Sequence, residues 1–204
     1  MSKRTGKEVV APTIAEKRDL LFTHEQMLAN QLARQVIDKP KPPLWMILVP
    51  VFFVFFAMKM KEYKTGVKNF ARNWMITRDL ALDAAYDAVD GGGAPQIDAL
   101  LSEAKELKQE VLPLYRQWVE GLVEHFSQLL DAEGETIEDL IRNHYRTRSN
   151  FQLTLRQLSR LEQEYLQALL PTLPGDQNDL QATIYRIKEI NTVLQQQSVD
   201  AVFK

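Results

Sequence analysis

The sequence has 204 residues, of which 45% are hydrophobic and 25% charged, as is ordinary for a chain of one or two globular domains. Its formal net charge of −2 lacks the positive excess that nucleic-acid binders usually show, so no nucleic-acid partner is expected. Cysteine is absent, which excludes disulfide bonds, thiolate metal ligands and a thiol nucleophile.

Residues 1–43 are predicted to form a basic tail, an amphipathic helix and a proline-rich linker. Thr13 and Glu16 have the spacing of a helix-capping box, and the helix should run to about Asp38, because Pro40 disfavours helix just before it. Its apolar stripe consists of Ile14, Leu21, Leu28, Leu32 and Val36. The stripe fits either a helix lying on a membrane surface or one packed against the rest of the protein.

Residues 44–58, LWMILVPVFFVFFAM, carry no charge, and we interpret residues 44–61 as a membrane anchor. A buried core helix is the alternative, but such a helix usually keeps a polar face. At about 1.5 Å per residue the run covers roughly 22 Å of a hydrocarbon core about 30 Å thick. Pro50 predicts a kink, which leaves either a bent span or a re-entrant segment. The expected anchor residues are Leu44, Trp45, Pro50, Phe52, Phe53, Phe55 and Phe56.

Lysines stand on both sides of the anchor, where anionic lipid headgroups would lie. They are Lys39, Lys41, Lys59, Lys61, Lys64 and Lys68. Their symmetry favours the re-entrant alternative. If the segment spans instead, the larger number of basic residues after it places the C-terminal part in the cytoplasm. We therefore expect location at the cytoplasmic membrane, with the bulk of the chain cytoplasmic.

Residues 62–204 are predicted to form a helical bundle without strands. The expected helices are about 66–90, 97–132, 137–170 and 177–203. In the first, Phe70 and Trp74 are one turn apart and fit either the membrane interface or the core. Pro113 should bend the second. The second and third should pair as a long antiparallel hairpin, whose acid-rich half (98–133) and base-rich half (142–160) would attract each other.

One interruption of the apolar pattern is a candidate site. The three-four spacing from Ile141 places His144 and Arg148 on the apolar seam, where they could bind a carboxylate or another ligand. Alternatively, Tyr145 occupies the seam while the two basic residues reach outward or pair with acids such as Glu120.

No pattern typical of a catalytic, nucleotide or metal site is present, and neither His125 nor His144 follows a glutamate at the spacing of a di-iron bundle. We therefore expect no enzyme activity and no cofactor. The sequence predicts an all-α, membrane-anchored helical bundle acting as an interaction or scaffold protein. Its partners would be the lipid bilayer and another protein or a second copy. The alternatives are a lipid-binding or membrane-shaping monotopic protein and a small accessory subunit of an integral membrane complex.

Overall fold

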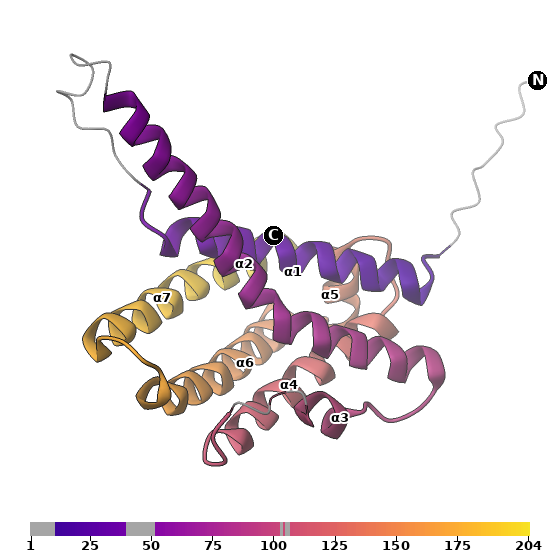
Figure 1. The fold of residues 1–204 in the computed structure, drawn as a ribbon. Coiled ribbons are helices and arrows are strands. Elements are labelled where there is room, and N and C mark those ends of the chain that lie inside the picture. The colour runs from indigo at the N-terminus through magenta and orange to yellow at the C-terminus, as the bar shows by residue number, and fades with distance from the viewer. Residues whose placement is uncertain (1–10, 40–51, 103, 105–106) are drawn as a thin grey trace, which may run out of the picture.

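The computed structural model describes residues 11–39, 52–102, 104 and 107–204. Within these ranges every regular element is a helix, which confirms the predicted all-α class (Figure 1). The α-helices are α1 (Ile14–Val36), α2 (Phe52–Gly91), α3 (Ile97–Ser102), α4 (Leu112–Asp131), α5 (Ile137–Tyr145), α6 (Arg148–Leu169) and α7 (Gln177–Val202), with a short 3₁₀ turn at Leu170–Thr172.

Helix α1 begins at the predicted capping box. The Thr13 hydroxyl accepts a hydrogen bond from the Glu16 amide at 3.2 Å, and the Glu16 carboxylate accepts one from the Thr13 amide at 2.8 Å. The helix packs against α2, α4, α5 and α7. Its buried residues are Leu21, Ala29, Leu32, Ala33 and Val36. The apolar stripe of α1 therefore faces the protein interior.

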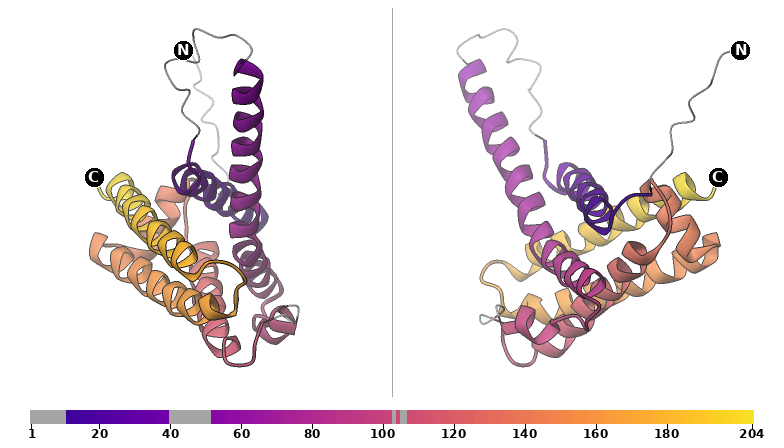
Figure 2. Two further views of the ribbon diagram at one scale, coloured as in Figure 1. Left: turned by 60° about the vertical axis from the view of Figure 1, so that its left-hand side comes forward. Right: turned by 90° about the vertical axis from the view of Figure 1, so that its right-hand side faces the viewer.

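Helix α2 is far longer than predicted, because it continues the apolar run without a break. It has 40 residues and begins at Phe52 rather than near residue 66. Ala71 is its first buried residue among those whose side chains are described, and residues 59–70 are exposed or half-buried. Figure 2 shows the N-terminal part of α2 projecting away from the other helices. The rings of Phe70 and Trp74 stack with centroids 6.1 Å apart and pack against buried residues, as the core alternative requires.

The predicted anchor is only partly within the described residues. Leu44, Trp45, Pro50 and Lys41 lie outside them, whereas Phe52, Phe53, Phe55 and Phe56 lie in the first turns of α2. Across the described parts of the chain, no helix combines the length and the apolar character needed to cross a membrane.

The long helical hairpin is present in a shorter form, because both of its predicted halves are interrupted. Pro113 lies in the first turn of α4, where proline is tolerated, so it starts a helix rather than bending one. The second half is divided at Arg146, which has φ 61°, and Thr147 caps α6. Helices α4 and α6 keep the antiparallel pairing: the rings of Tyr115 and Tyr165 lie 5.2 Å apart.

Among the described residues, the salt bridges of the two predicted halves of the hairpin do not join one half to the other. Arg142 pairs with Asp139 at 3.2 Å on α5, and Arg160 pairs with Glu164 at 3.6 Å on α6. Arg148 reaches α7 instead. No salt bridge between residues 98–133 and residues 142–160 occurs in the described structure. Apolar contacts, and not salt bridges, hold the two halves of the hairpin together.

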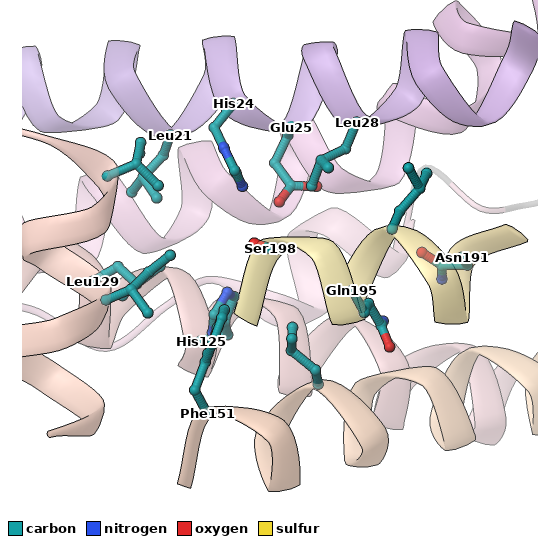
Figure 3. Close-up of a pocket in the computed structure, with 14 residues that line it drawn as sticks. Leu21, His24, Glu25, Leu28, His125, Leu129, Phe151, Asn191, Gln195 and Ser198 are labelled. Atoms are coloured by element: carbon teal, nitrogen blue, oxygen red, sulfur yellow. The ribbon is translucent and has the colours of Figure 1, made fainter. Parts of the chain in front are cut away.

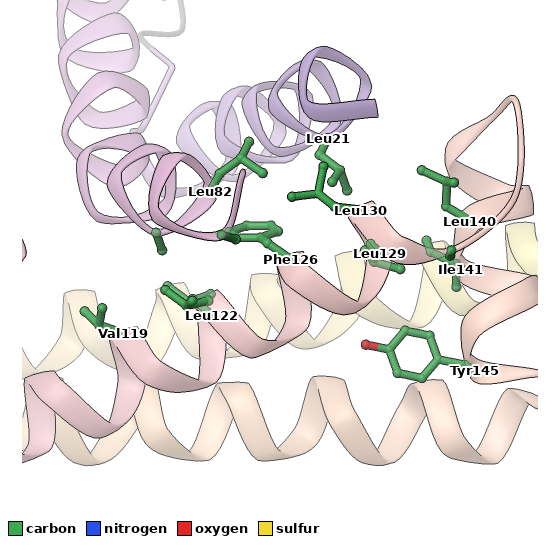
Figure 4. Packing of buried hydrophobic residues seen from close by; sticks show 14 of the residues in the cluster. Leu21, Leu82, Val119, Leu122, Phe126, Leu129, Leu130, Leu140, Ile141 and Tyr145 are labelled. Atoms are coloured by element: carbon green, nitrogen blue, oxygen red, sulfur yellow. The ribbon is translucent and has the colours of Figure 1, made fainter. Parts of the chain in front are cut away.

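Helix α4 lies at the centre of the main hydrophobic core. Its largest fully buried residues contact leucines from α1, α2 and α5 (Figure 4). They are Val119, Phe126, Leu129 and Leu130, and their partners include Leu21, Leu82 and Leu140. The buried residues of α4 form a broad stripe, because both members of adjacent pairs such as Leu122–Val123 and Leu129–Leu130 are buried, and this width lets several helices pack against it.

Candidate functional site

The projecting part of α2, Phe52–Phe70, is the first candidate site, and we call it the arm. At about 1.5 Å per residue it is roughly 27 Å long. Its lysines Lys59, Lys61, Lys64 and Lys68 are exposed, and so is Lys39 just after α1. Within the described chain, Lys59 alone of these forms an ion pair, with Glu62 at 3.7 Å. The arm thus combines an apolar beginning with a series of accessible cations.

The end of α1 lies beside the base of the arm. Ile37 Cγ2 is 3.7 Å from the position that a Cβ atom on Gly66 would occupy. Before this point, Val36 is still buried in the bundle. The chain therefore leaves the bundle at Ile37 and returns to it along α2, next to the point of departure.

The structure puts Tyr145, not His144 or Arg148, at the buried seam position. Tyr145 is 5% exposed, whereas His144 is half-buried and packs edge-on against the Tyr145 ring. Arg148 is exposed and pairs with Asp200 of α7. The two predicted seam residues are therefore not brought together into a site.

A buried histidine–tyrosine pair lies next to that seam. His125 Nδ1 and the Tyr145 hydroxyl are 2.6 Å apart, which links α4 to α5. Burial, followed by the nearby His144, lowers the pKa of His125 to about 4, so this imidazole is neutral at physiological pH. Burial likewise raises the pKa of the Tyr145 hydroxyl.

A second buried polar cluster surrounds Arg78 of α2. Arg78 Nε lies 3.2 Å from Glu25 Oε2 of α1, and Arg78 Nη2 donates to Glu162 Oε1 of α6 at 3.0 Å. The guanidinium carbon stands 4.3 Å from the centre of the Trp74 ring and 5.5 Å from that of Trp118. The cluster ties α1, α2, α4 and α6 together.

The environment of Glu162 opposes its ionisation. Burial raises its pKa, and the neighbouring Arg78 acts in the opposite direction but more weakly. Asn191 of α7 adds a hydrogen bond to Glu162 Oε2 at 3.3 Å. Arg78 Nη1 is buried and has no hydrogen-bond partner among the described residues. The cluster is therefore held by two carboxylates and two aromatic rings but is not fully satisfied.

The cavities beside these polar groups are small. One of about 50 Å³ is bordered by His24, Glu25 and His125, as Figure 3 shows. A neighbouring cavity of about 70 Å³ is bordered by Arg78 and Glu162. Sites for small molecules usually enclose about 300–1,000 Å³, so these spaces suit water rather than a substrate. We interpret both buried clusters as links between helices.

The described residues contain no group of three or more His, Asp or Glu side chains arranged to hold a metal ion. Searches of protein families, of curated proteins and of solved structures found no match to this chain.

Proposed function

We propose that this protein is a membrane-attached helical scaffold whose apolar run, residues 44–58, enters one leaflet of a bilayer and leaves it on the same side. In this arrangement the helical bundle stays at one face of the membrane and presents its surface to a protein partner or a second copy. The lipid bilayer is the first partner and anionic headgroups are the contact of the lysines.

The observation that carries this proposal is the packing of α1 with α2. Helix α1 ends before the apolar run and α2 contains the last residues of that run, and both helices contribute buried residues to one bundle. Because Ile37 lies beside Gly66, the two ends of the intervening segment are held close together. A segment that crossed the bilayer would put α1 and the rest of the bundle on opposite sides and expose their shared core. This favours re-entry over a span.

The dimensions of the arm support shallow insertion. Residues 52–58 rise about 10 Å along the helix axis beyond Lys59, compared with about 15 Å for half of the hydrocarbon core. The lysines that follow would then lie at the headgroup level, where their stems can cover apolar surface and their charges can meet phosphates.

Exposed apolar side chains on α6 and α7 support the scaffold part of the proposal. Leu153 is 67% exposed, Tyr185 58% and Val193 51%. These exposed side chains offer apolar contacts to another protein.

The test of topology uses single cysteines in the full, naturally cysteine-free chain. Ala15 on α1 and Gln197 on α7 are both exposed, so Ala15→Cys and Gln197→Cys can each report one side of the apolar run. In intact cells, a membrane-impermeant maleimide should label either both cysteines or neither of them. Labelling of one position alone would mean that the chain crosses the bilayer and would overturn the proposal.

Flotation with vesicles separates the alternative functions. Binding of the purified chain to anionic vesicles without change of vesicle shape supports the scaffold, whereas tubulation or fragmentation supports a membrane-shaping protein. No binding to any vesicle, with co-purification of an integral membrane complex, supports an accessory subunit and contradicts direct attachment.

A further inference from the structure

A groove between α6 and α7 is lined by three cationic residues and no carboxylate. The groove has a volume of about 270 Å³ and is bordered by Arg156, Arg160 and Lys188 together with five neutral hydrogen-bonding residues. Apolar residues and acids are both missing from its lining. The buried cavities, by contrast, are each bordered by leucines and by Glu25.

The three cations come together because α6 and α7 run antiparallel. Gln152 and Gln196 are joined by a hydrogen bond of 3.3 Å near one end of the pair, and Asn191 contacts Glu162 at 3.3 Å further along. Arg156 and Arg160 are one helical turn apart on α6, and Lys188 reaches the same groove from α7.

Two of these cations lack a carboxylate partner. Within the described chain, no salt bridge involves Arg156 or Lys188, and Arg160 contacts only Glu164 at 3.6 Å. Earlier in the same basic stretch, Arg142 and Arg148 are each paired with an aspartate. Like charges gathered in one groove repel each other, and an anion bound between them relieves that repulsion.

Neutral hydrogen-bond donors lie at the floor of the groove. Gln195 Nε2 donates to Ser159 Oγ at 2.7 Å, which leaves the hydrogen of the Ser159 hydroxyl able to donate to a ligand. Ser159, Asn191 and Gln195 border both this groove and the buried cavity beside Arg78, so the floor is fixed by packed residues.

We propose that this groove binds a phosphate-type oxyanion, such as the phosphoryl groups of a phosphate ester or a diphosphate. Arginine offers paired donors that match the oxygens of a phosphate, and lysine adds a compact charge. A single phosphoryl group contacts one arginine and the floor; a second one extends the ligand toward Lys188. The proposal concerns the bundle and is independent of the arm.

The phosphoryl group can come from a soluble ligand or from a lipid headgroup. The first experiment uses inorganic pyrophosphate and the full chain, with calorimetry at constant ionic strength. Saturable binding is expected, and the double variant Arg156→Gln/Lys188→Gln should weaken it at least tenfold. The matched control Arg34→Gln/Arg72→Gln removes two exposed cations from α1 and α2 and should leave binding unchanged. Absence of saturable binding, or equal weakening by both double variants, overturns the proposal.

The second experiment distinguishes the two sources with vesicles that contain phosphatidic acid. If the ligand is soluble, Arg156→Gln/Lys188→Gln should float with the vesicles as the unaltered chain does, although it has lost pyrophosphate binding. If the groove takes a headgroup, the same variant should lose flotation as well. Either result supports an oxyanion site, provided that pyrophosphate binding depends on the two residues.

Discussion

Glu162 is the one buried carboxylate in the described part of the bundle, with an exposed fraction of 2%. It persists there because Arg78 and Asn191 both contact it, and because Trp74 and Trp118 cover the guanidinium. Such an ion pair adds little net stability over apolar residues, since both charges lose their hydration. Removal of one member of the pair is costly, because the charge of the other member stays buried. The cluster therefore fixes which helices meet more than it strengthens them.

Glu162→Ala should lower the free energy of unfolding by about 3–5 kcal/mol, because it leaves the buried Arg78 with one carboxylate fewer. Glu164→Ala, two positions away on the same helix, removes an exposed pair with Arg160 and should lower it by about 1 kcal/mol or less. Urea unfolding followed by circular dichroism measures both. Similar losses in the two variants would contradict the role given to the cluster.

His125 predicts a dependence of stability on pH. Its folded-state pKa of about 4 lies below the unfolded value of about 6.5, so the unfolded chain takes up the proton first. The contribution of the neutral His125 to the free energy of unfolding is fully present above about pH 6.5. It falls by about 3 kcal/mol as the pH falls toward 4. His125→Gln should flatten the stability curve over this range, measured by urea unfolding at each pH.

Tyr145→Phe provides the comparison for that experiment. It removes the hydrogen bond to His125 Nδ1 but leaves the imidazole buried, so the pH dependence should remain while overall stability falls by about 1 kcal/mol. Loss of the pH dependence in Tyr145→Phe would assign it to the hydrogen bond instead of burial.

The sequence carries a signal for the Arg78 cluster in the positions of two charged residues within apolar stripes. On α6 the apolar positions Leu155, Leu158 and Tyr165 keep a three-four rhythm, and the missing member of that rhythm is Glu162. Arg78 stands one turn after Trp74 on α2 in the same way. A charge in phase with a buried stripe indicates a buried pair, but its partner comes from a distant helix, which one helix's periodicity does not reveal.

Among the elements, helix ends marked by local hydrogen bonds were predictable. The cap at Thr13 and the one at Thr136, whose hydroxyl accepts from the Asp139 amide at 3.2 Å, are examples. The division between α5 and α6 was missed, because the Thr147 cap lacks the acid of a capping box. The interruption of the apolar pattern at His144 and Arg148 was interpreted as a candidate site and not as a helix end. The fusion of the apolar run with α2 was also missed, since no residue there distinguishes an anchor from the helix that follows it.

The turn before α5 depends on the absence of a side chain at Gly134. A Cβ atom there would lie 2.7 Å from Asp139 Cβ and 2.9 Å from the Leu140 backbone nitrogen, at φ 152°. Gly134→Ala should therefore lower the free energy of unfolding by about 1–3 kcal/mol, because backbone and Cβ atoms in a helix cannot move aside.

Gly91→Ala is the matched control for Gly134→Ala. Gly91 ends α2, and no atom outside its own stretch of helix lies within 4 Å of the position that a Cβ atom would occupy there. Alanine should therefore be neutral or slightly stabilising at this position. Thermal unfolding of both variants measures the contrast. A tolerated Gly134→Ala would show that the turn can open without loss.

At the scale of the whole molecule, the bundle and the arm have different requirements. Helices α1 and α4 bury a continuous core, whereas the described side chains of the arm are exposed or half-buried. The core alone therefore does not explain why α2 extends so far beyond it. The proposed attachment to an anionic bilayer surface would account for the extension, because such a surface suits both the apolar start of α2 and its lysines.

Replacement of Lys59, Lys61, Lys64 and Lys68 by glutamine tests that environment. Each lysine near an anionic surface contributes about 1 kcal/mol, so the quadruple variant should bind vesicles rich in phosphatidylserine up to roughly a thousandfold more weakly. Binding of the unaltered chain should fall with added salt, because the headgroup attraction is screened. A control makes the same charge change outside the arm and outside the α6–α7 groove, at Arg72, Lys108, Arg146 and Lys204, which are all exposed.

The control should retain most of the affinity, because contact through the arm depends on where the charges lie and not on the net charge alone. Vesicle co-sedimentation over a range of lipid concentrations gives both affinities. If the two quadruple variants lose affinity equally, attraction to the membrane surface depends on the net charge of the protein, and the arm is not the contact. If only the arm variant loses it, the bundle is held at the surface by α2, on the side where α1 and α7 also lie.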